Sequence, residues 1–169
     1  ALSESDPKMK SPRRRGSERQ GSTMVEMAFV LPIFFVLLLG LVEFGRAFMC
    51  IQVINAAVRN GAYMGMMGGV SNGEVRAAIR NQLASANINV SDSQIQILNG
   101  APYDQLGEDD EPPSADDLDP VDLLDESVMK PRALAIIRVV VPFKDVSFLT
   151  TPVWLGDVDI VGQIAMRHE

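Results

Sequence analysis

The sequence has few of the residues on which enzymes and disulfide-rich proteins depend. Its 169 residues include one cysteine and one histidine. The single cysteine, Cys50, excludes an internal disulfide framework. We expect it to fill apolar space, with a disulfide between two chains as the less favoured alternative. The single histidine, His168, has no serine or cysteine partner in a catalytic motif. Phosphate-binding loops, zinc-ligand spacings and dinucleotide fingerprints are also missing, so we expect neither enzyme activity nor a cofactor.

Basic residues are in the minority, and the net charge is −7. Residues 104–126 hold eleven acidic residues and no basic one. This balance is wrong for contacts with phosphates, so we expect no nucleic acid partner.

The acidic segment has two interpretations. The first is a calcium site, because carboxylates are hard oxygen ligands. The second is a solvated loop whose charges repel one another, and the absence of EF-hand spacing favours it, although a helix could form at residues 121–129. We therefore expect residues 105–127 to give few apolar side chains to a core. The calcium candidates are Asp116, Asp117, Asp119, Asp122 and Asp125.

Charge is missing altogether from residues 27–42, which are almost wholly apolar. A bilayer core needs roughly 20 apolar residues in a helix, and the flanking Met24, Val25, Phe44 and Phe48 extend this run. Pro32 should kink the helix gently, as membrane helices tolerate. The alternative, a buried helix of a soluble protein, would usually keep a polar stripe, and this segment has none. The sequence therefore predicts one helix across a lipid bilayer.

The charges on either side of the apolar run predict its orientation. Before it stand Arg13, Arg14, Arg15 and Arg19, and after it Arg46 alone lies close. The positive-inside rule then keeps the N-terminus in the cytoplasm and sends the C-terminal part across the membrane. A cleaved secretory signal has the same basic-then-apolar order, but no small-residue cleavage site follows this apolar run. We expect the chain to start at Met9, which opens a compact basic leader.

Gly21 and Glu26 stand just before the apolar run. A cut between Gly21 and Ser22 would make Ser22 the new N-terminus and Glu26 the fifth residue. Residues four apart share a helix face, so the new ammonium would lie one turn from a carboxylate, its own or a neighbour's. The attraction between these two charges is stronger where the dielectric constant is low. A basic leader, a glycine, four residues, a glutamate and an apolar helix together resemble the class III signal of type IV prepilins and pseudopilins.

A narrower resemblance covers about residues 19–64, which resemble the TadE-like family, pseudopilins of the tight-adherence (Tad/Flp) pilus and secretion system. Its polar and glycine positions interrupt an otherwise generic apolar run, which makes the match fairly specific. Ser22 departs from the aromatic residue often found at the first mature position of major pilins. The last residues, I-A-M-R-H-E, resemble the closing strand common in this family. The matching positions are Gly21, Val25, Glu26, Pro32, Gly40, Glu43, Phe44, Gly45, Arg46, Asn55, Ala56, Ala57, Arg59 and Gly61.

The resemblance implies a minor pseudopilin, a structural component of pilus assembly or related secretion, anchored in the inner membrane with its C-terminal domain on the periplasmic side. A separate prepilin peptidase would cut between Gly21 and Ser22. Other pseudopilins and inner-membrane pilus assembly proteins would be its partners, besides the lipid bilayer. The residues implied in assembly are Glu26, Pro32, Glu43 and Arg46. The alternative is an uncleaved bitopic anchor that carries an acidic, calcium-binding module outside the membrane.

The rest of the chain predicts an α+β head. We expect the long helix to continue to about residue 67 as a stalk. Glu43 and Arg46 should partly neutralise each other in it, and its apolar face should include Phe48, Ile51, Ile54 and Val58. Glycines end it, and the capping box of residues 71–74 starts a second, shorter helix that runs to about residue 86.

Three strands should follow, at residues 93–99, 133–143 and 157–167, because β-branched or alternating residues fill them. They should form a small antiparallel sheet, with the second strand in the centre, packed on the stalk helix. Phe148 and Trp154 should plug its open end. The expected domains are a disordered leader (1–21), the membrane and stalk helix (22–68) and the head (69–169) with its acidic loop (103–130).

Overall fold

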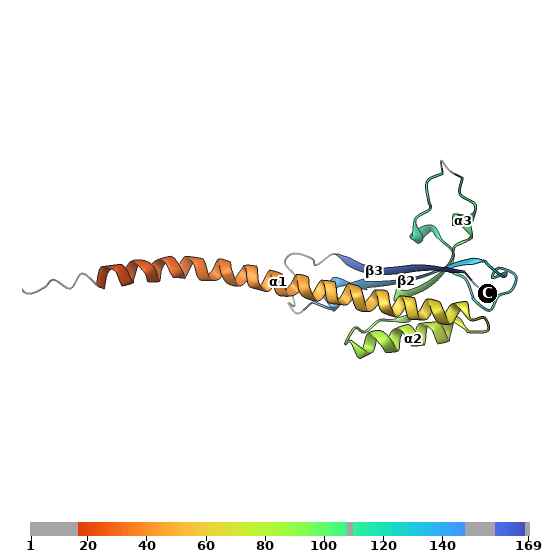
Figure 1. Ribbon diagram of the computed structural model, residues 1–169, viewed down its shortest axis with the longest axis horizontal. Helices are drawn as coiled ribbons and strands as arrows, with labels where there is room; N and C mark the ends of the chain where they lie inside the picture. Colours follow the sequence, from red (N-terminus) through yellow and green to blue (C-terminus); the bar gives the residue numbers. More distant parts are fainter. Residues whose placement is uncertain (1–16, 108–109, 148–157, 168–169) are drawn as a thin grey trace, which may run out of the picture. The chain divides into compact units, whose positions relative to one another are not determined.

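The computed structural model describes residues 17–107, 110–147 and 158–167. The predicted start at Met9, the Phe148 and Trp154 plug, and His168 lie outside these residues. The predicted architecture is confirmed: a long N-terminal helix, a second helix and a three-stranded antiparallel sheet (Figure 1). The main elements are α1 (Ser17–Met66), α2 (Asn72–Ser85), β1 (Ile95–Asn99), β2 (Leu134–Pro142) and β3 (Asp159–Arg167). The short ones are η1 (Asp92–Gln94), α3 (Ala101–Asp104), η2 (Ala115–Asp117) and η3 (Phe143–Asp145).

The chain divides into two compact units, one up to Leu41 and one from Val42 onward. In the first unit, every residue from Gly21 to Leu41 except Gly40 is exposed. This stretch has no polar stripe because nearly all of its side chains are apolar. It belongs to the one helix, among the described residues, that is long and apolar enough to cross a membrane. α1 already includes residues 17–21, which the sequence assigns to the leader.

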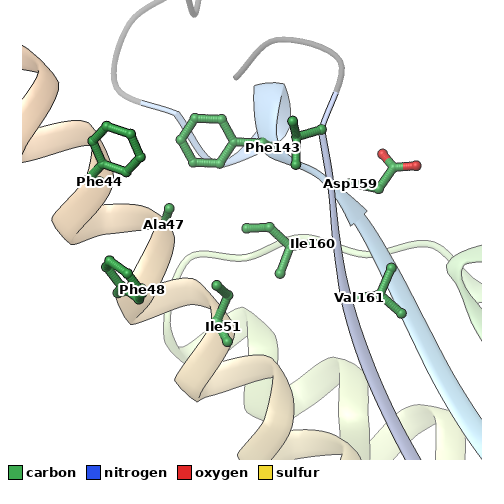
Figure 2. A pocket seen from close by; sticks show the side chains of 9 residues that line it. Phe44, Ala47, Phe48, Ile51, Phe143, Asp159, Ile160 and Val161 are labelled. Atoms are coloured by element: carbon green, nitrogen blue, oxygen red, sulfur yellow. The ribbon is translucent and has the colours of Figure 1, made fainter. Parts of the chain in front are cut away.

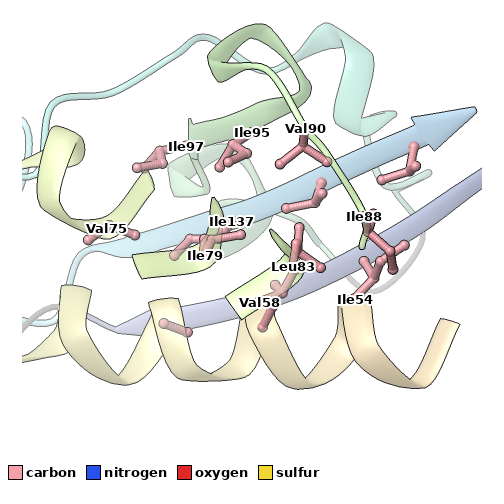
Figure 3. Packing of buried hydrophobic residues seen from close by; sticks show 14 of the residues in the cluster. Ile54, Val58, Val75, Ile79, Leu83, Ile88, Val90, Ile95, Ile97 and Ile137 are labelled. Carbon is pink, nitrogen blue, oxygen red and sulfur yellow. The ribbon is translucent and has the colours of Figure 1, made fainter. Parts of the chain in front are cut away.

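In the second unit, α1 and α2 run side by side and cover one face of the sheet (Figures 1 and 3). α1 contributes Ile54 and Val58, both almost completely buried, and α2 contributes one apolar residue per turn. The predicted apolar face of α1 needs one correction: Phe48 is 65 % exposed, whereas Cys50 is 4 % exposed and belongs to the core. The α2 residues are Val75, Ile79 and Leu83.

β2 is the central strand, as predicted, and both neighbours pair with it antiparallel. Its odd-numbered side chains are buried on one face, and on the opposite face Ile136 is buried too, because the two faces meet different partners. Ile137 and its odd-numbered neighbours pack on the helices, while Ile136 joins Leu98 and Leu118 in a smaller cluster on the opposite face. Leu118 comes from the acidic segment, so this segment covers part of the outer face.

The ends of the two helices follow local chemistry. Gly68 and Gly69 have φ of 54° and 73°, a left-handed backbone that glycine adopts without a Cβ penalty, and they end α1. The predicted capping box starts α2: Glu74 N–H donates to Ser71 Oγ, and Ser71 N–H donates to Glu74 Oε2 at 2.9 Å. These bonds favour the ionised carboxylate and lower the pKa of Glu74.

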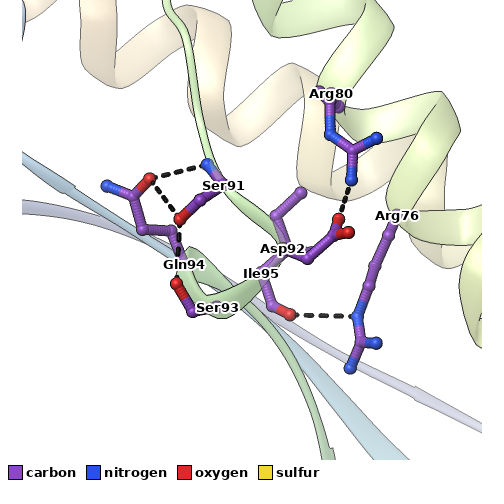
Figure 4. A network of polar contacts seen from close by, with 7 residues as sticks. All are labelled: Arg76, Arg80, Ser91, Asp92, Ser93, Gln94 and Ile95. Atoms are coloured by element: carbon purple, nitrogen blue, oxygen red, sulfur yellow. Dashed lines mark hydrogen bonds and ion pairs between the residues drawn. The ribbon is translucent and has the colours of Figure 1, made fainter.

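Two arginines of α2 join that helix to the start of the sheet (Figure 4). Arg76 Nε donates to the Ile95 carbonyl at 3.2 Å, and Arg80 forms an ion pair with Asp92. Since both partners of the ion pair are largely exposed, its contribution to stability is small, about 0–1 kcal/mol. The bond to the Ile95 carbonyl satisfies a backbone acceptor on the β1 edge.

The acidic segment differs most from the prediction. Instead of staying outside the core, it adds Val121 (7 % exposed) and Leu123 (2 % exposed) to the main apolar cluster. Its backbone pairs with the β1 edge: Val121 N–H donates to the Ile97 carbonyl, and Asn99 N–H donates to the Asp119 carbonyl. Residues 121–129 form turns rather than the helix considered above. The expectation that residues 105–127 give little to a core is therefore wrong, because a few apolar side chains inside an acidic stretch are enough to anchor it.

Adjacent leucines test this correction. Leu123→Ala should lower the free energy of unfolding of the head by about 2–5 kcal/mol, because it leaves a cavity in the core. Leu124→Ala should change it by less than about 0.5 kcal/mol, since Leu124 is 49 % exposed. Urea unfolding of the full chain in detergent, followed by circular dichroism, measures both. Equal effects would show that the segment is not part of the core.

α1 packs closely on the sheet at Gly162 of β3. A Cβ at this position would lie 2.5 Å from Ile54 Cγ2 and 3.3 Å from Val58 Cγ2. Glycine therefore leaves the space into which the α1 side chains pack. A hydrogen in place of a methyl group is what lets α1 lie directly on β3.

We expect Gly162→Ala to destabilise the head by about 1–3 kcal/mol through overpacking against Ile54. Gly73→Ala is the matched control, because at Gly73 the nearest atom to a new Cβ is Ser71 Oγ at 3.8 Å. It should be neutral or slightly stabilising in the helix. Thermal melts of both variants, and of Gly162→Ala combined with Ile54→Ala, provide the measurement. Strictly additive effects in the double variant would contradict the close contact.

Candidate functional site

The residues predicted for cleavage, Gly21 and Ser22, lie in α1 and are exposed. A Cβ at Gly21 would meet nothing within 4 Å, so the fold itself does not require glycine here. Glu26 is also exposed and lies four residues after Ser22, which places both on one helix face. The bond between Gly21 and Ser22 is thus in a helix, and glycine weakens that helix by roughly 0.5–1 kcal/mol relative to alanine. This glycine makes the bond easier to expose by local unwinding.

Pro32 lies inside α1 and is exposed, with helix on both sides of it. It belongs to the first compact unit, and Glu43 and Arg46 belong to the second. Of the six residues predicted for cleavage and assembly, the second unit therefore holds Glu43 and Arg46, which lie three positions apart on α1.

Glu43 and Arg46 connect α1 to the end of η3. Glu43 is 6 % exposed and is the only buried charged side chain among the described residues. Ser147 Oγ donates a hydrogen bond to Glu43 Oε2 at 3.0 Å. One turn further on, Arg46 Nε donates to the carbonyl of Val146. These bonds join residues about 100 positions apart in the sequence.

The sequence predicted Glu43 and Arg46 as a pair but did not identify their partners Val146 and Ser147. No local pattern marks Ser147, which follows the short apolar and charged run after β2. The only general signal is the cost of a buried carboxylate, which requires a hydrogen-bond donor nearby. This requirement predicts that a donor exists without saying which residue supplies it.

Beside this connection lies an apolar cavity of about 330 Å³ between α1, η3 and β3 (Figure 2). Phe44 and Phe48 form one wall and are 50 % and 65 % exposed. Phe143 is buried at the back, and Val161 on β3 is 42 % exposed. Asp159 is the one charged residue among the described residues of the lining, which also include Ala47, Ile51, Val158 and Ile160.

The described residues that line the cavity are apolar apart from Asp159, and they include no nucleophile with an adjacent base. In the part of the chain that the structure describes, no group of three or more metal-ligating side chains is placed to hold an ion. Two of the calcium candidates have partners within the protein. Asp116 forms an ion pair with Arg138. Ser127 N–H and Oγ donate hydrogen bonds to Asp125 Oδ1 and lower the pKa of Asp125.

An exposed apolar helix that leads into a small α+β head defines a class of protein, in which one N-terminal helix could anchor a folded domain to a membrane. Within that class, residues 21–62 match the family model described as TadE-like protein. The predicted resemblance is confirmed for this segment, which begins at Gly21 and ends inside the second half of α1. No curated protein and no solved structure matches the chain.

A double-mutant cycle tests the connection between α1 and η3. We expect Glu43→Ala and Ser147→Ala each to destabilise the head, with a coupling free energy of about 1.5–3 kcal/mol, because the acceptor is a buried carboxylate. Glu126→Ala, which removes an exposed carboxylate, is the control and should be neutral. Urea unfolding of the full chain measures all four variants. A coupling near zero would mean that Ser147 does not hold Glu43.

Proposed function

We propose that this protein is a TadE-like minor pseudopilin, a structural component associated with the Tad pilus, and not an enzyme. The observation that carries the proposal is the family match over residues 21–62, which includes the glycine, the glutamate and the apolar helix in one segment. The exposed apolar surface of α1 supports membrane insertion, because such a surface is costly in water.

In this proposal the N-terminus stays in the cytoplasm and the head faces the periplasm, because the basic residues precede the span. A prepilin peptidase cuts after Gly21, and other pseudopilins are the assembly partners. The new ammonium of Ser22 then pairs with Glu26 of an adjacent subunit. An exposed carboxylate near the end of an apolar helix is available for this purpose, since a charge at the membrane edge gains most from an opposite charge beside it.

Cleavage is tested at Gly21. The peptidase must bring its catalytic groups close to this backbone, and a β-branched side chain would obstruct the approach, so Gly21→Val should block cleavage. Gly40→Val is the control: it also adds a side chain to α1 where a Cβ meets nothing within 4 Å, and it should be cleaved normally. Mass spectrometry of the membrane-extracted protein reads the loss of everything up to Gly21. A retained leader in the wild-type chain, with an active peptidase present, would favour the uncleaved bitopic anchor.

Assembly is tested at Glu26. Glu26→Val should insert more easily and largely still be cleaved, because it removes a charge from the membrane edge. It should nevertheless fail to co-purify with partner pseudopilins from membranes, since the ammonium of Ser22 loses its partner. Glu111→Val, at an exposed position of the acidic segment, is the control and should co-purify normally. Normal co-purification of Glu26→Val would remove the ion-pair role.

A further inference from the structure

We propose that the apolar cavity at the base of the head, between Phe44–Phe48 of α1 and the start of β3, takes up acyl chains of the lipid bilayer. The inference rests on the proposed membrane anchoring but adds a second membrane contact, made by the head itself.

The cavity lies directly after the uncharged run of α1. Its wall begins at Phe44, two residues after Val42, where the uncharged run ends. At a rise of about 1.5 Å per residue, Phe44 and Phe48 follow Val42 by roughly 3 Å and 9 Å along the helix. The polar layer of a bilayer is roughly 5–8 Å thick on each side. The uncharged run 27–42 spans only about 24 Å, less than the roughly 30 Å of a hydrocarbon core, so we expect the core to reach past Val42 and Phe44 to lie at its edge.

The described lining of the cavity is mostly apolar and partly exposed. Two phenylalanines, the side chain of Val158 (48 % exposed) and that of Val161 (42 % exposed) present apolar surface to the outside. The uncharged stretch 27–42 precedes this wall along α1, and of the two charged residues that follow it, Glu43 is buried and Arg46 is half-buried. A large exposed apolar patch is typical of an interaction site or a membrane contact.

The chemistry of the rim distinguishes lipid from a protein partner. A specific protein interface has a polar rim and about one hydrogen bond per 100–200 Å². Here the lining offers one charged side chain, that of Asp159, which is exposed and can stay in the headgroup water. Acyl chains need no hydrogen bonds and adapt to the shape of a cavity. Their burial gains about 0.8 kcal/mol per CH₂ group, as for any apolar chain that leaves water.

The test uses the full chain with its only tryptophan replaced, Trp154→Phe. Into this background Val161→Trp places a fluorescent probe at the cavity, and Leu124→Trp places a control probe of similar exposure (49 %) beside Leu123, whose Cδ1 lies near Gly65 at the far end of α1. Both proteins are reconstituted into phosphatidylcholine vesicles with brominated acyl chains. We expect the emission of the cavity probe to fall several-fold relative to unbrominated vesicles and that of the control to stay unchanged.

A further variant tests occupancy of the cavity. Adding Ala47→Phe to the Val161→Trp protein fills the cavity from the α1 side and should reverse most of the quenching. Co-flotation with the vesicles is measured for every protein, because loss of flotation in the wild-type chain would contradict the membrane anchoring itself. Flotation without quenching of the Val161→Trp probe would overturn only this inference and would show that another part of the chain or a second copy covers the cavity. Equal quenching of both probes, or quenching that Ala47→Phe leaves unchanged, would also overturn it.

Discussion

The head depends on the second half of α1 as one wall of its core. A small antiparallel sheet needs an apolar face that packs on another element to be stable by itself, and here α1 and α2 cover that apolar face. The contact at Gly162 shows how close this packing is, since Ile54 Cγ2 occupies the space that a Cβ would need. The helix is therefore not a tether that ends where the head begins. This agrees with the division of the chain into compact units after Leu41, well before the end of α1.

The sequence predicted those elements that depend on patterns among residues a few positions apart. The alternation of residues 159–167, the β-branched run of β2 and the capping box at Ser71 each depend on neighbours a few positions away, and all three are present in the structure. The central position of β2 was predicted as well, because its run is β-branched and almost wholly apolar. The long helix was equally clear, since residues 27–42 carry no charge and no polar stripe.

The acidic segment shows where such patterns fail. Its average composition predicts a solvated loop, and most of its carboxylates are indeed exposed. The average, however, hides Leu118, Val121 and Leu123, which are buried because the backbone between them pairs with β1. That pairing joins residues about 20 positions apart and leaves no periodic trace in the sequence. The same reason explains why Ser147 could not be identified as the partner of Glu43, although Glu43 itself was a candidate.

Glu43 also connects the fold to the proposed membrane anchoring. It is the first charged residue after the uncharged run, and in the folded head its carboxylate is buried and accepts a hydrogen bond from Ser147. This hydrogen bond matters because burying a charge in an apolar medium costs several kcal/mol unless the charge is paired or hydrogen-bonded. Once Ser147 is in place the carboxylate is covered by the head, and Phe44 beside it remains exposed on the apolar side.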